Sequence, residues 1–205
     1  MKRSNPKVFI YLASQSARRA DLLKRQKIPF QAVPSPFRET HRRKESPQKT
    51  VLRNAFGKAF RAKLPAHRPS KARSRQVWIL GADTVVYFRG KALGKPRHYK
   101  EAVRTLSAMG GKSHQVYTGL VLLSPDHKKV LRGWAVTKVV MKRWDNARIK
   151  DYVVKIHALD KAGSYAIQEK PCIAAAYQGS FSNVVGLPRE LLGKLLAQTF
   201  CKEPT

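Results

Sequence analysis

The sequence predicts a mixed α/β fold, and two observations support this. Short apolar runs bounded by turn residues alternate with segments whose apolar residues recur at helical spacing. The chain has 205 residues, of which 42% are hydrophobic. That is enough for one sizeable core, or for two lobes that share a sheet. We therefore expect residues 1–205 to form a single domain around a central mixed β-sheet.

The amino-terminal part is expected to form a strand over 8–13, followed by a helix that has Ser16 as its N-cap and ends before Pro29. A strand, a serine-containing turn and a helix suit a phosphate, because the first N–H groups of a helix have no partner within it. Arg18 and Arg19 would add guanidinium groups there. Two solvated arginines on an exposed helix face are an equally good interpretation.

The next predicted helix has the clearest signals. Ser46 is its N-cap, Pro47 takes the first helical position, and Lys58 is expected at the rim of its apolar stripe. The basic stretch 65–76 follows, and its Pro, Ser, Lys and Arg content predicts an exposed loop and a subdomain hinge. The stripe consists of Val51, Leu52, Ala55, Phe56, Ala59 and Phe60.

A second buried strand is expected over 77–80, ending at Gly81-Ala82-Asp83-Thr84, with 85–88 continuing in extended form. The Gly94-Lys95-Pro96 sequence should then break the chain ahead of a helix. The remaining expected elements are a β-hairpin of 114–123 and 130–144, helices over 145–156 and 188–197, and short strands over 164–168 and 173–177.

Charge is the most unusual property of the chain. There are 42 Lys and Arg residues against 12 Asp and Glu, a formal net charge of +30. Such a charge favours association with polyanions, and nucleic acid, anionic lipid and free nucleotides all remain candidates. For most of these residues a solvated cationic face is the simpler interpretation. The expected association with nucleic acid is non-specific and uses the basic surface.

The compartment is expected to be the cytoplasm. Cys172 and Cys201 lie far apart in the sequence and fit a reducing environment. The apolar run over 8–13 is too short for a signal-peptide core, and no stretch approaches the roughly 20 apolar residues of a membrane span. We therefore expect no contact with a membrane.

A few side chains could carry chemistry. Asp83 follows an apolar strand, where it could accept a proton or hold a metal, although a turn cap is an equal alternative. Lys95 lies on a restricted turn that suits an anionic oxygen. Taken alone, however, Lys95 and Lys58 are ordinary surface lysines, and Glu39 is a local partner for its basic neighbours. The histidine spacing matches no metal-binding motif, so a metal would be held by oxygen, which points to Mg²⁺ or Mn²⁺.

Eight segments, in order, resemble the Maf family of nucleoside triphosphate pyrophosphatases, in the branch that acts on dTTP and UTP. They cover nearly the whole chain. The segments are 12–19 (LASQSARR), 38–40 (RET), 58–59 (KA), 81–84 (GADT), 94–96 (GKP), 114–119 (HQVYTG), 160–168 (DKAGSYAIQ) and 182–188 (SNVVGLP).

The resemblance implies a Maf/ITPase-like fold of two lobes around a deep cleft, often dimeric, and hydrolysis between the α and β phosphates with Mg²⁺ or Mn²⁺. It implies that Asp83 is the proton acceptor and that Lys58 and Lys95 line the cleft. Glu39 and Asp83 are the implied metal ligands. The substrate would be UTP, dTTP or a modified pyrimidine nucleotide.

The resemblance also implies which residues bind the substrate. Thr84 and Gln168 match positions associated with substrate choice, and both residues fit the UTP/dTTP branch rather than the branch that acts on 7-methyl-GTP. Gln168 presents both a donor and an acceptor, which suits the N3–H and a carbonyl of uracil or thymine. The implied substrate-binding residues are Ser14, Ser16, Arg18, Arg19, Thr84 and Gln168.

Four positions depart from the family pattern. Ala17 replaces a proline, Arg38 and Gly57 replace acids, and Glu169 replaces a glycine. The loss of two acids near the cleft would weaken metal binding or change its geometry. The alternative function is a basic nucleic-acid-binding module on a Maf-like scaffold with weak or no catalysis, which the charge supports. Against that alternative, the sequence carries no known nucleic-acid-binding motif.

Overall fold

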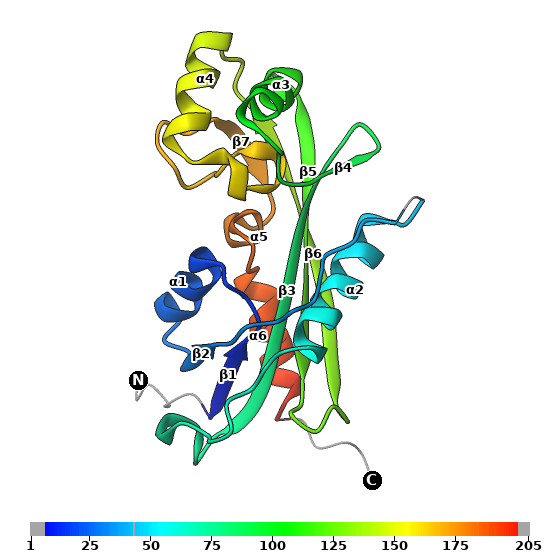
Figure 1. Ribbon diagram of the computed structural model, residues 1–205, viewed down its shortest axis with the longest axis vertical. Coiled ribbons are helices and arrows are strands. Elements are labelled where there is room, and N and C mark those ends of the chain that lie inside the picture. The colour runs from blue at the N-terminus through cyan, green and yellow to red at the C-terminus, as the bar shows by residue number, and fades with distance from the viewer. Residues whose placement is uncertain (1–6, 43, 201–205) are drawn as a thin grey trace. The chain divides into compact units, whose positions relative to one another are not determined.

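The computed structural model describes residues 7–42 and 44–200, so Arg43 and Cys201 lie outside the described part. Its central sheet is mixed and has seven strands in the order β2-β1-β3-β5-β6-β7, with β4 paired to β3 (Figure 1). The predicted mixed α/β fold is therefore confirmed. The chain divides into two compact units.

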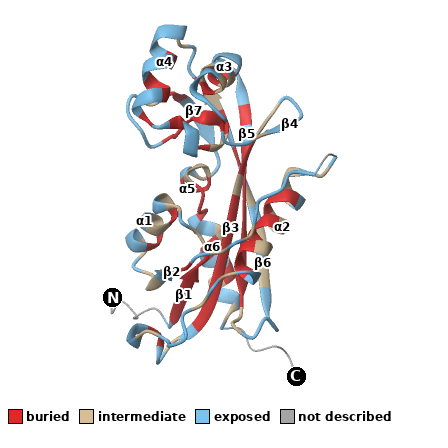
Figure 2. Ribbon diagram, viewed as in Figure 1, coloured by how far each residue is buried: buried red, intermediate tan, exposed pale blue. Residues whose placement is uncertain are grey.

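The first unit comprises residues 1–83, 119–134 and 189–205. Strand β1 (Val8–Leu12) pairs in parallel with β2 (Phe30–Ala32) on one side and with the beginning of β3 (Gln76–Phe88) on the other. All five residues of β1 are buried (Figure 2), as expected for a parallel strand covered on both faces. The helices of this unit are α1 (Ala17–Arg25), α2 (Pro47–Phe60) and α6 (Arg189–Gln198).

Helix α2 lies directly against the backbone of two strands. A Cβ atom on Gly81 of β3 would be 2.0 Å from the carbonyl oxygen of Ala55, and one on Gly119 of β5 (Ser113–Leu123) would be 2.7 Å from the carbonyl carbon of Val51. Real Cβ atoms do not approach other atoms this closely, so only glycine fits at either position. The two glycines thus let α2 pack closer to the sheet than side chains would permit.

The second unit comprises residues 84–118 and 135–188. Strands β3, β5 and β6 (Val130–Met141) contribute residues to both units. A buried cluster that includes Leu106, Tyr152 and Ile173 forms its core. Its other elements are β4 (Lys91–Leu93), α3 (Tyr99–Met109), α4 (Asn146–Lys155), β7 (Ala174–Gln178) and α5 (Phe181–Val185).

The predicted strand over 164–168 and the predicted hinge over 65–76 are both wrong. Residues 164–168 do not form a strand, because Gly163 and Ser164 have φ values of 69° and 65° and turn the chain out of an extended path. Segment 65–76 does not link the two units, since the division falls after Asp83. Ala72 within this segment is fully buried, on a short 3₁₀ helix. Most of the segment is exposed, as predicted.

The sequence did not predict β2, β4 or α5, each of which has only three to five residues. Elements of that length contain too few residues to show a period. None of the helices within residues 7–42 and 44–200 combines the length and apolar character needed to cross a membrane.

Candidate functional site

Asp83 lies within a continuous strand. We predicted that the strand ends before this residue, and that is wrong, because β3 runs unbroken from Gln76 to Phe88. The pairing with β1 ends where Leu80 faces Leu12, so Asp83 lies beyond the end of that neighbouring strand. Only 3% of Asp83 is exposed. A buried carboxylate requires partners that compensate for its lost hydration.

Lys58 of α2 provides the first partner. Its Nζ lies 2.8 Å from Asp83 Oδ1, 2.5 Å from Glu39 Oε1 and 3.1 Å from the carbonyl oxygen of Ala82. An ammonium group has three N–H donors, so these three acceptors use all of them. Lys58 is buried, which corrects its predicted place at the rim of the helix. It joins two carboxylates that are 44 positions apart in the sequence.

Asn54 provides the second partner, and the sequence analysis missed it. It is completely buried, and its Nδ2 donates to Asp83 Oδ2 at 2.9 Å. Its Oδ1 accepts from the backbone N–H of Thr40, so the amide group can face Asp83 only with its nitrogen. A signal was present: Asn54 precedes Lys58 by four residues, and side chains at this spacing share a helix face.

The loop that carries Glu39 is clamped to α2 by Arg53. This arginine donates to both carboxylate oxygens of Glu45, to the carbonyl oxygen and hydroxyl of Thr40, and to Asn54 Oδ1. Hydrogen bonds from Arg53 lower the pKa of Glu45 to about 2, although burial acts in the opposite direction. Bidentate pairing of this kind is among the stronger side-chain interactions. The clamp therefore holds Glu39 near Lys58.

Replacing Glu45 by glutamine should make stability less dependent on acid. Because the native pKa of Glu45 is about 2 and its ordinary value is 4.5, its ionised form stabilises the fold above pH 4.5, and this contribution is lost as pH falls toward 2. We expect Glu45→Gln to lower the unfolding free energy at pH 7 by about 1–2 kcal/mol and to flatten its fall between pH 4.5 and 2.

Urea unfolding at several pH values measures this difference. Asp21→Asn is the control, because the Asp21–Lys24 pair is exposed on both sides and exposed pairs contribute little. A Glu45→Gln profile parallel to that of the wild type would contradict the role of the clamp.

Arg19 lies near the same carboxylates. It is buried and donates to Ser14 Oγ at 3.1 Å. Burial lowers the pKa of its guanidinium, while the charges of Asp83 and Glu39 raise it. Ser16 occupies the N-cap of α1 as predicted, but its side chain makes no capping hydrogen bond.

The charges of Arg18 and of the amino terminus of α1 agree with the predicted phosphate-binding turn. The first turn of the helix contains no acid, and Arg18 is half-buried beside Arg19. The like charge of Arg18 is a further, smaller cause of the lowered pKa of Arg19, which reflects repulsion between the two charges. An anion between them would relieve this repulsion.

The structure explains one of the departures from the family pattern. A Cβ atom on Gly57 would lie 2.2 Å from the ring of Phe37, so that ring fills the space that an acidic side chain would need. Phe37 comes directly before the Arg38-Glu39 pair in the clamped loop. The path of this loop, which places the Phe37 ring against α2, thus requires a residue without a side chain at Gly57.

Thr84 begins the second unit and contacts Thr118 of β5, with 3.0 Å between the two hydroxyl oxygens. Thr118 donates its hydroxyl hydrogen to the carbonyl oxygen of Asn183. A carbonyl oxygen can only accept, so Thr84 must be the donor toward Thr118.

Lys95 and Gln168 are both exposed and both belong to the second unit. The turn that carries Lys95 is tied to the segment that leads to Gln168, because the N–H of Gly163 donates to the carbonyl oxygen of Gly94 at 3.1 Å. The predicted site residues therefore form two groups. By membership of a unit, Ser14, Ser16, Arg18, Arg19, Glu39, Lys58 and Asp83 belong to the first, and Thr84, Lys95 and Gln168 belong to the second.

The residues on the first unit fit a small divalent cation. Glu39 and Asp83 each place a carboxylate oxygen within hydrogen-bonding distance of one lysine nitrogen. Mg²⁺ is commonly held by one or two carboxylates, with water and substrate phosphates completing its shell. No cluster of three or more His, Cys, Asp or Glu that could hold a metal occurs in the described part of the chain. The carboxylates of Glu39 and Asp83 would therefore suit a cation whose other ligands come from water and the substrate phosphates.

Comparison with known proteins agrees with the sequence motifs. The family model described as Maf-like protein matches residues 9–199. Proteins named dTTP/UTP pyrophosphatase from Gloeobacter violaceus, Hydrogenovibrio crunogenus and Photorhabdus laumondii are 38%, 35% and 36% identical to this chain. The matches cover 93%, 93% and 92% of this chain and 96%, 95% and 94% of those relatives. The chain belongs to the Maf-like protein family.

Proposed function

We propose that the protein is a nucleoside triphosphate pyrophosphatase that converts dTTP or UTP to the monophosphate and pyrophosphate. The observation that carries this proposal is the pair of carboxylates, Glu39 and Asp83, held together by one buried lysine. The names of the relatives supply the substrate class.

In the proposed reaction, Asp83 accepts a proton from a water molecule whose oxygen attacks the α phosphorus. The bond from that phosphorus to the bridging oxygen breaks, and pyrophosphate leaves. Lys58 and Asn54 fix the direction of the Asp83 carboxylate, which a proton acceptor requires. Because all three donors of Lys58 are taken, we assign Lys58 to the carboxylates rather than to the phosphates. Arg18, Arg19 and Lys95 are the proposed phosphate contacts.

Glu39 and Asp83 are the residues that would hold Mg²⁺ or Mn²⁺. Such a cation would neutralise charge on the phosphate oxygens. Glu39 is well placed to meet it, since 44% of its side chain is exposed, compared with 4% for Asp83.

Gln168 is proposed to select the pyrimidine base. We expect wild-type protein, given Mg²⁺ or Mn²⁺ and a panel of common and modified triphosphates, to release pyrophosphate fastest from UTP or dTTP. Gln168→Glu removes the amide donor and adds a charge, so it should reduce kcat/KM for UTP by roughly 10- to 100-fold, because the carbonyl of the base would lose its hydrogen-bond donor and face a carboxylate instead. An unchanged preference for UTP would contradict the assignment, and release of phosphate alone would contradict the proposed function.

We also propose a cytoplasmic location and a homodimer, as expected from the sequence. The basic binding module remains the second candidate function, and the surface that favours it is described next. Catalysis and nucleic-acid binding are compatible on one chain, because they would use different residues.

A further inference from the structure

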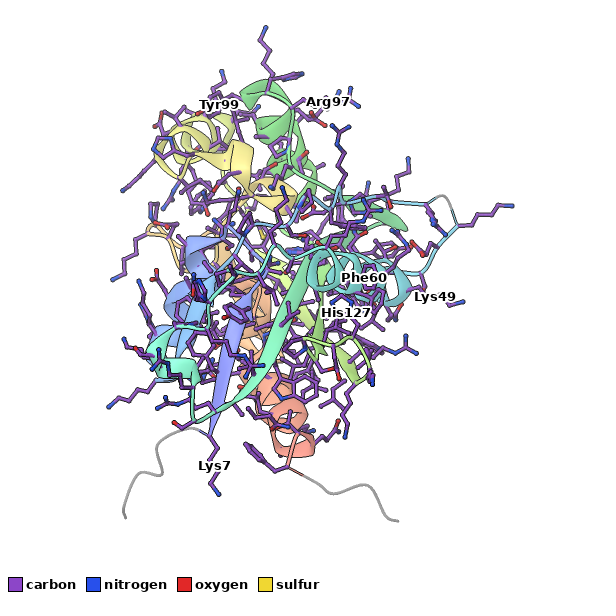
Figure 3. All side chains as sticks on the ribbon, turned by 60° about the horizontal axis from the view of Figure 1, so that its bottom comes forward. Lys7, Lys49, Phe60, Arg97, Tyr99 and His127 are labelled. Carbon is purple, nitrogen blue, oxygen red and sulfur yellow. The ribbon has the colours of Figure 1, made fainter. Side chains whose placement is uncertain are left out.

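Three aromatic rings form an exposed row on the first unit. Phe56 and Phe60, four residues apart on α2, are 39% and 50% exposed, and their rings stack with centroids 5.7 Å apart and planes 22° apart. His127, from the turn between β5 and β6, lies 4.8 Å from the Phe60 ring (Figure 3). We name these three residues the aromatic row. Phe56 and Phe60 were predicted to belong to the apolar stripe of α2, so their exposure needs another explanation.

The chain around the aromatic row is strongly basic. No Asp or Glu occurs between Glu45 and Asp83 in the sequence. Exposed basic residues follow each part of the row directly: Arg61 and Lys63 after Phe60, and Lys128 and Lys129 after His127. Asp126 is the acid of this turn, and it accepts hydrogen bonds from Ser124 Oγ and the Lys128 N–H.

This combination favours one class of partner. A second copy of the chain would bring two strongly cationic surfaces together, which costs free energy. A lipid bilayer would need an amphipathic helix free to lie in the interface. The remaining apolar face of α2 is not free, because Val51, Ala55 and Ala59 are completely buried in the protein core. Stacked rings beside lysines and arginines instead match the surfaces that hold unpaired bases and their phosphates.

We propose that the aromatic row binds single-stranded nucleic acid. Bases stack on Phe56, Phe60 and His127, and the flanking basic residues contact the phosphates. Binding is tolerant of sequence, because every base offers a flat face. It depends on salt, because each phosphate contact releases counterions. The row contains none of the residues assigned to pyrophosphate release, so this proposal stands or falls separately from the proposed function.

Fluorescence anisotropy with a labelled 12-nucleotide oligo(U) strand tests the proposal. We expect Phe56→Ala/Phe60→Ala to weaken binding roughly 10- to 100-fold at fixed salt, since losing a stacking platform has about this effect. Phe56→Leu/Phe60→Leu keeps most of the apolar volume and removes the planar rings, so it should also weaken binding. Tyr99→Ala is the matched control: Tyr99 is 39% exposed, as Phe56 is, lies beside Arg97 and Lys100, and belongs to the second unit.

A second variant tests the basic part of the surface. Lys63→Gln/Lys128→Gln should reduce the slope of log affinity against log salt by roughly 1 to 1.5, as expected for two lost phosphate contacts on a single strand. Thermal unfolding of every variant verifies that the fold is retained.

Four outcomes would overturn the proposal. Wild-type protein that does not bind the strand at physiological salt is one, and equal affinity of the alanine and Tyr99→Ala variants is another. Equal loss for a 12-base-pair duplex would mean that stacking is not involved. The fourth outcome is an alanine variant that still binds the oligonucleotide but loses another interaction of the wild type. Loss of binding to phosphatidylglycerol vesicles would assign the row to a lipid surface, and loss of self-association measured by sedimentation would assign it to a second copy.

Discussion

Asp83→Asn is expected to reduce kcat for pyrophosphate release by about 10²- to 10⁴-fold, because an amide cannot accept the proton from water. The substitution also disturbs the buried contacts. Asn54 donates toward position 83, so the new amide must turn its oxygen to Asn54, and its NH₂ group then faces Lys58. We therefore expect a lower melting temperature as well. The measurements are pyrophosphate release from UTP and dTTP with Mg²⁺ or Mn²⁺, together with thermal unfolding.

Glu39→Gln distinguishes the role of the Glu39 carboxylate from that of Asp83. Glu39 makes the same type of contact with Lys58 as Asp83 does, but it is far more exposed. Its replacement should therefore raise the metal concentration needed for half-maximal activity, and it should reduce kcat less than Asp83→Asn does. If Glu39→Gln abolished turnover at saturating metal and Asp83→Asn did not, Glu39 would be the proton acceptor. Oligo(U) binding should be unaffected by Asp83→Asn, which keeps the two activities distinguishable.

Gly81→Ala should be the most destabilising small substitution at the site. The new methyl group would lie 2.0 Å from the carbonyl oxygen of Ala55, so α2 would have to move away from β3. We expect a loss of at least about 2 kcal/mol in unfolding free energy. We also expect a large fall in kcat, since Lys58 and Asn54 reach Asp83 from this helix. Chemical denaturation and pyrophosphate release measure the two effects.

Gly193→Ala is the matched control. Gly193 lies inside α6, and a Cβ atom there would meet nothing within 4 Å. Alanine favours a helix over glycine by about 1 kcal/mol, so this variant should be slightly more stable than the wild type. Gly81→Ala protein as stable and active as the Gly193→Ala protein would show that the contact between α2 and β3 is not required.

Much of the fold could be predicted from local sequence patterns. Ser46 and Pro47 correctly marked the start of α2, and the Ser46 side chain does accept from the N–H of Lys49. The apolar run at 8–13 correctly predicted β1. These signals act over a few residues, so they survive in a single sequence.

The environment of the site could not be predicted in the same way. A helical pattern shows which side of α2 faces the sheet, but it does not show how closely the helix approaches. The close approach depends on Gly81 and Gly119, which lie on other strands, and it is what buries Lys58. The exposure of Phe56 and Phe60 has a related cause: the apolar stripe is wider than the strip of α2 that the sheet covers.

The glycine contacts beneath α2 bear on how this chain tolerates its composition. Where a helix rests on neighbouring strands through main-chain atoms, its height above the sheet does not depend on the sizes of the surrounding side chains. Substitutions of those side chains should therefore leave the 2.8 Å distance between Nζ of Lys58 and Oδ1 of Asp83 largely unchanged. Main-chain contacts, and not the composition of the surface, thus set the height of α2 above the sheet.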